Sequence, residues 1–123
     1  MIDVTKENFK EFLTYYHGLH DAIFKNINFN ILKDEVEIVL HIIWAGDTEL
    51  DEDSKFKTVD SNIRLVFKGI RDINIKYIES VDYINEAYFK YINYQNEECI
   101  CFAEDINKPY VYVVAKSFSY EEI

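Results

Sequence analysis

Apolar residues near the amino terminus recur at positions i, i+3, i+4 and i+7, as Phe9, Phe12, Leu13 and Tyr16. This spacing places them along one face of an α-helix. Thr5 precedes the stripe as a capping residue, and Gly18 follows it at the point where a left-handed residue commonly ends a helix. The pattern therefore predicts a helix over residues 5–17.

From residue 23 onward the period changes to two, which is typical of strands. The alternation covers residues 23–31, 36–44, 62–68, 73–77, 87–95, 98–104 and 110–119. The short turn at 33–35 predicts an antiparallel hairpin, and Gly69 predicts a bend or bulge. Residues 79–86 fit a helical turn as well as a strand. The predicted fold class is α+β, a mainly antiparallel β-sheet meander with an amino-terminal α-helix packed on it.

A chain of 123 residues suits one globular domain over residues 1–123. The longest apolar run, Ile38–Ala45, is far shorter than the roughly 20 residues that a membrane span needs. Acidic residues near the amino terminus take the place of the basic flank of a signal peptide. We therefore expect a cytoplasmic protein that has no membrane partner and is a monomer or a weak homodimer.

The charge balance is acidic, with 13 lysines and arginines against 23 aspartates and glutamates and a net charge of −10. Such a surface repels phosphate backbones, so nucleic-acid binding is not expected. It attracts basic proteins and speeds their encounter. A second interpretation is that the charge only keeps a small domain soluble.

Two histidines and an aspartate crowd the stretch His17-Gly18-Leu19-His20-Asp21. One interpretation is a metal or catalytic site formed by His17, His20 and Asp21 together with His41. The other is a joint between helix and strand, in which His17 caps the helix end and Asp21 bonds backbone N–H groups. Because Gly18 separates the two histidines, the joint is the favoured interpretation. The adjacent His-Asp pair also resembles helical metal-dependent phosphohydrolases, but only in that dipeptide.

Five acidic residues lie in the loop predicted over 45–59, at Asp47, Glu49, Asp51, Glu52 and Asp53. Their alternation suggests calcium, yet the loop lacks the glycine of an EF-hand at its sixth position, and Thr58 stands where the bidentate glutamate belongs. We expect an exposed acidic loop, which is also a plausible contact surface for a basic protein.

Three scattered glycines provide no phosphate-binding or dinucleotide-binding loop, and the serines carry no nucleophile signature. No cofactor is expected. Cys99 and Cys101 lie two apart on a predicted strand, so both point to one face as reduced, partly buried thiols. Tyrosines gather towards the carboxyl end, where they either form an interface, line a ligand cavity or fill the core. They are Tyr83, Tyr88, Tyr91, Tyr94, Tyr110, Tyr112 and Tyr120.

The chain resembles small bacterial proteins, some of them immunity proteins of polymorphic toxin systems. The resemblance rests on Phe12, on "HGLHDA" at 17–22, on Ile27 and Phe29, and on "LVFKGI" at 65–70. It implies an α+β domain that binds and blocks a toxin, and it assigns no catalytic residue.

The leading hypothesis is a non-enzymatic cytoplasmic binding protein of immunity type, which neutralises a basic toxin through an acidic, tyrosine-rich surface that includes Asp47–Asp53. The alternative is a small metal-dependent hydrolase that uses the His/Asp cluster.

Overall fold

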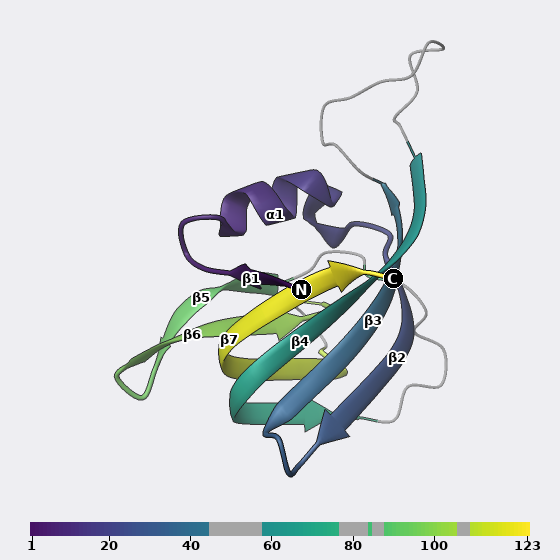
Figure 1. Cartoon of the computed structure of the whole chain (residues 1–123). Helices are drawn as coiled ribbons and strands as arrows, with labels where there is room; N and C mark the ends of the chain where they lie inside the picture. The colour runs from purple at the N-terminus through teal and green to yellow at the C-terminus, as the bar shows by residue number, and fades with distance from the viewer. Residues whose placement is uncertain (45–57, 77–83, 85–87, 106–108) are drawn as a thin grey trace.

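The computed structural model describes residues 1–44, 58–76, 84, 88–105 and 109–123. These residues form a single seven-stranded sheet with one α-helix, α1 (Phe9–Tyr15), packed on it (Figure 1). The strands are β1 (Ile2–Val4), β2 (Ile23–Asn30), β3 (Glu35–Trp44), β4 (Thr58–Ile75), β5 (Tyr88–Tyr94), β6 (Glu97–Ala103) and β7 (Val111–Glu122). The predicted α+β class, with a mainly antiparallel sheet and an amino-terminal helix, is confirmed.

The strand order is β2-β3-β4-β7-β6-β5, and every neighbouring pair is antiparallel. Two meanders, β2-β3-β4 and β5-β6-β7, are thus joined through the long pairing of β4 with β7. β1 pairs with the end of β7, with Ile2 opposite Tyr120. The pairing of β1 was not predicted, because three residues are too few to show a period.

The core lies between α1 and one face of the curved sheet (Figure 1). Alternate residues of each strand face it, because successive side chains of a strand point to opposite sides. In β3 these are Val36, Ile38, Leu40 and Ile42, all at most 2% exposed. The helix adds aromatic rings, with Phe12 lying 5.5 Å from Phe118 and 4.7 Å from Tyr120 between ring centroids.

The helix is shorter than the predicted span of 5–17, since it begins at Phe9 and ends at Tyr15. Residues 6–8 form a turn in which the Asn8 Oδ1 accepts the Thr5 N–H at 2.7 Å. That side-chain bond holds the backbone in a turn where the capping pattern predicted helix. In the described residues no helix is long and apolar enough to cross a bilayer.

The predicted irregularity at Gly69 is present in β4. Gly69 has φ +68°, and the register of β4 against β7 shifts between Ile70 and Asp72. Asp34, in the turn between β2 and β3, accepts the Gly69 N–H with its carbonyl and the Ile70 N–H with its carboxylate. The bulge of β4 is therefore held by the neighbouring hairpin.

Candidate functional site

The stretch His17–Asp21 forms a left-handed joint between α1 and β2. His17, Gly18, Leu19 and Asp21 all have positive φ, between 52° and 64°. The Leu19 side chain is fully buried in the core. The Asp21 N–H donates to the Ile84 carbonyl at 3.0 Å, which fastens the joint to a distant part of the chain. This conformation is unfavourable for the three residues that are not glycine, so contacts with the rest of the fold must hold the backbone in it.

The histidines of this stretch lie close together near the surface. The His17 and His20 rings are 6.0 Å apart between centroids, and the His20 Nε2 lies 3.5 Å from the Asp21 Oδ2. His41 lies on the face of β3 opposite the core, where its Nδ1 is 2.9 Å from the Asn62 Oδ1. Among the described residues, no three His, Cys, Asp or Glu side chains are grouped to hold a metal ion. The metal-dependent hydrolase stays a prediction that no observation favours.

The five acidic residues predicted to contact a partner, Asp47, Glu49, Asp51, Glu52 and Asp53, lie outside the described residues. Their role therefore stays a prediction. Another candidate site is formed by described residues where the first and last strands meet the helix.

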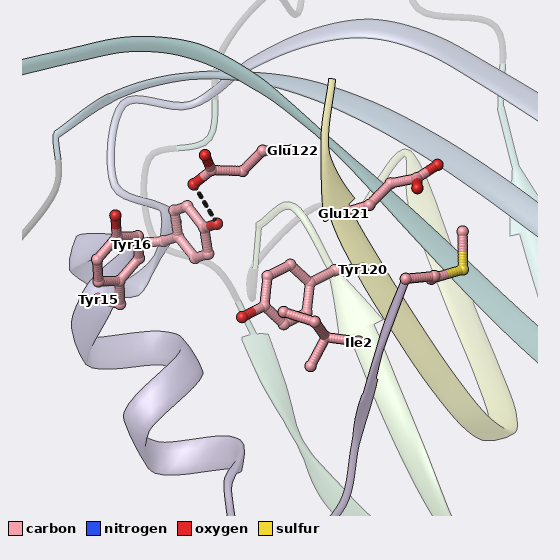
Figure 2. A pocket seen from close by; sticks show the side chains of 7 residues that line it. Ile2, Tyr15, Tyr16, Tyr120, Glu121 and Glu122 are labelled. Carbon is pink, nitrogen blue, oxygen red and sulfur yellow. Dashed lines mark hydrogen bonds between the residues drawn. The ribbon is translucent and has the colours of Figure 1, made fainter.

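Two adjoining hollows form an open groove between α1 and the pair β1–β7. Figure 2 shows the side chains that line the larger of these two hollows. Their volumes are about 430 Å³ and 340 Å³, and both are lined by Ile2, Tyr15 and Tyr120. We call this surface the terminal groove. Its full lining is Met1, Ile2, Val4, Asn8, Glu11, Phe12, Tyr15, Tyr16, Tyr120, Glu121 and Glu122.

Local structure explains why these side chains face the groove. Ile2 pairs with Tyr120 across β1 and β7, so both side chains project from the same face of the sheet. Tyr15 occupies the last turn of α1 outside the apolar stripe and is 53% exposed. Figure 2 shows Ile2 beside Tyr120 and Tyr15 on the helix. The floor is thus apolar and aromatic.

Carboxylates surround this floor. Glu11 lies exposed in the first turn of α1. The Tyr16 hydroxyl donates to the Glu122 Oε1 at 2.7 Å (Figure 2). Burial raises the pKa of Tyr16 far above its ordinary value, and the bond to Glu122 raises it further. Tyr16 therefore keeps its proton and holds Glu122 at the groove.

Glu121 has a different environment, because it pairs with a cation on β4. The Arg64 guanidinium donates to Glu121 and, through Nε at 2.8 Å, to Glu37. These bonds raise the pKa of Arg64. No lysine, arginine or histidine side chain is among the residues that line the terminal groove. The groove therefore presents hydrogen-bond acceptors and aromatic rings, which suit a cationic group on an apolar stem.

The tyrosines of the carboxyl-terminal part lie in three different environments. Tyr120 lines the terminal groove, and Tyr91 packs on the main core. Tyr88, Tyr94 and Tyr112 lie on the other face of the sheet, against Cys99 and Cys101. Both cysteines are free and buried, in agreement with the predicted thiols. Tyr83 lies outside the described residues.

The terminal groove was not predicted, because its walls come from the two ends of the sequence. One signal was available, since Tyr15 is a large apolar residue off the helical stripe. Comparisons of the chain with models of protein families, with curated proteins and with solved structures found no match.

Proposed function

We propose that this chain is a non-enzymatic binding protein that recognises a basic segment of another protein in the terminal groove. The observation that supports the proposal is the composition of the groove, in which Glu11 and Glu122 lie beside tyrosine rings and no described lining residue is basic. Tyrosine combines a large contact area with a polar tip and is enriched in binding hot spots.

The net charge of −10 supports the same assignment at longer range. A strongly acidic surface accelerates the approach of a basic partner, and salt screens that attraction. In its narrower form the proposal is an immunity-type protein that neutralises a basic toxin. The acidic run Asp47–Asp53 is the predicted second contact.

Titration with a short lysine- and arginine-rich peptide tests the proposal, with a neutral peptide of equal length as reference. We expect saturable chemical-shift changes in NMR spectra at Ile2, Tyr15 and Tyr120, which weaken as salt is raised. The double variant Glu11→Gln/Glu122→Gln should lose at least tenfold in affinity.

The matched control is Glu35→Gln/Glu98→Gln, which removes the same number of negative charges from residues that do not line the groove. It should reduce affinity only slightly, because charges outside the groove contribute mainly through screened long-range attraction. Equal losses in the two double variants would show that net charge, rather than the groove, governs binding and would refute the proposal.

A further inference from the structure

The turn between β2 and β3 carries two aliphatic side chains that do not pack in the core. Ile31 is 76% exposed and Leu32 is 97% exposed. Phe29, at the end of β2, is 43% exposed. Turns of this kind usually carry polar residues, so an aliphatic apex on an otherwise acidic protein indicates a contact surface. We call Ile31, Leu32 and Lys33 the apex.

The backbone of the apex is fixed on both sides. The Lys33 N–H donates to the Asn30 Oδ1 at 3.2 Å, and the Asp34 N–H donates to the Ile31 carbonyl at 3.3 Å. Asp34 in turn accepts two N–H groups of the β4 bulge, at 3.1 and 3.2 Å. An aliphatic pair on a fixed backbone loses little entropy when it enters a pocket, which favours binding.

The terminal groove matches the apex in chemistry. Its floor of Ile2 and tyrosine rings suits Ile31 and Leu32, and its carboxylates suit the adjacent Lys33. In Figure 1 the β2–β3 turn lies at the end of the sheet opposite α1 and β1, so the apex does not reach the groove of its own chain. A second copy provides the matching groove.

We infer that the apex of one copy docks in the terminal groove of another, with Ile31 and Leu32 on the aromatic floor and Lys33 beside Glu11 or Glu122. This inference rests on the groove chemistry that supports the proposed function, and it commits to a second copy of this chain as the occupant. Each copy has one apex and one groove, so the contact is head-to-tail and extends with concentration.

Sedimentation equilibrium with two complementary variants tests the inference. Leu32→Asp disables the apex and keeps the groove, whereas Tyr15→Lys places a cation in the groove and keeps the apex. Both positions are more than half exposed, and circular dichroism verifies that each variant folds. For the unmodified chain we expect a weight-average mass that rises with concentration above the 14.7 kDa of one chain.

Each variant alone should remain at the mass of one chain. An equimolar mixture should approach twice that mass and stop, because only one apex and one groove remain intact. Ile75→Asp adds the same charge at another exposed aliphatic residue, six positions along β4 from Gly69, and should associate like the unmodified chain. A monomeric unmodified chain, association of Leu32→Asp alone, or a mixture that stays monomeric would each overturn the inference.

Peptide titration of the Leu32→Asp variant separates this inference from the proposed function. Peptide binding with a monomeric unmodified chain overturns the docking of a second copy and leaves the proposed function in place. Association through the groove without peptide binding overturns the proposed function and leaves the docking in place.

Discussion

Gly18 and Gly69 both have left-handed backbones, with φ of +64° and +68°. Their surroundings differ, because a Cβ on Gly18 would meet nothing within 4 Å, whereas a Cβ on Gly69 would lie 2.9 Å from the Lys116 Cβ. The conformation alone costs a residue with a side chain about 1–2 kcal/mol. At Gly69 a steric clash with the neighbouring strand adds to that cost.

Gly69→Ala should therefore lower the free energy of unfolding by more than Gly18→Ala does. We expect about 1 kcal/mol for Gly18→Ala, and a larger loss for Gly69→Ala because β4 and β7 must separate to admit the methyl group. Urea denaturation followed by circular dichroism measures both. Equal losses would mean that Lys116 moves aside without cost.

Ionisation of Tyr112 makes the free energy of unfolding depend on pH in the alkaline range. Burial raises its pKa from 10.0 to about 12, and the neighbouring Cys101 contributes to the shift. Between pH 10 and 12 the Tyr112 hydroxyl is ionised in the unfolded chain and protonated in the folded chain. The free energy of unfolding that this difference contributes is fully present below pH 10 and is lost as pH rises towards 12. The raised pKa of Tyr16 acts in the same direction.

The urea midpoint should therefore fall as pH increases above about 10, the ordinary pKa of tyrosine. The fall should be smaller in Tyr112→Phe, which has no proton to lose at that position. Tyr110→Phe, which removes a hydroxyl from an exposed tyrosine, serves as the control. An identical decline in the unmodified chain and Tyr112→Phe would contradict this origin.

At the scale of elements, the connection from β6 to β7 depends on one buried carboxylate. Glu104 is 2% exposed and accepts the backbone N–H groups of Tyr110 and Val111, the latter at 2.8 Å. It thereby fixes the start of β7. Buried N–H groups that lose their acceptor cost about 1–3 kcal/mol.

Glu104→Ala should reduce the free energy of unfolding by about 1–3 kcal/mol for that reason. Glu104→Gln keeps one acceptor oxygen and should lose less. Glu98→Ala, which removes only the exposed ion pair with Lys6, should lose less than about 1 kcal/mol. Thermal or urea unfolding of the three variants measures the order, and a Glu104→Ala loss no larger than that of Glu98→Ala would refute the role.

The sequence pattern predicted strands well where alternation was long and uninterrupted, as in β3. It predicted a longer helix than exists, because the bond from Asn8 to the Thr5 N–H competes with helix formation. Glu104 carries no sequence signal of burial, since its partners six and seven positions away are backbone groups. Pairing of β4 with β7 is set by packing between distant segments, which local alternation does not encode.

At the scale of the molecule, the half of the sheet formed by β5, β6 and β7 is apolar on both faces. One face joins the main core, and the other buries Cys99, Cys101 and Val114 beneath tyrosines and Ile92. Burial raises the pKa of both thiols, which keeps them protonated and poorly nucleophilic.

A disulfide reagent such as dithionitrobenzoate should therefore react slowly with the folded protein. Its rate should increase with urea in parallel with global unfolding, because both cysteines are buried on β6, which pairs with β5 on one side and β7 on the other. Ser117→Cys, an exposed position on β7, provides a rapidly reacting reference. A rate that is fast in the absence of urea would show that β5 and β6 open separately.

The terminal groove is a feature of the whole molecule, because residues from both ends of the sequence form it. Met1 and Ile2 reach Tyr120–Glu122 through the β1–β7 pairing, and α1 closes the other side. The acidic charge and the value of tyrosine for binding were readable from composition. The place where acidic residues and tyrosines gather could not be predicted from composition, because it depends on the pairing of β1 with β7.

The position of β7 in the sheet also constrains the order of folding. It is the last strand along the chain, yet it pairs with β4, β6 and β1. A nascent chain that has not yet released residues 111–122 from the ribosome lacks the strand that joins its two meanders. Contacts between segments so far apart in sequence form slowly and leave strand edges exposed meanwhile. We therefore expect the sheet to be completed only after residues 111–122 have left the ribosome.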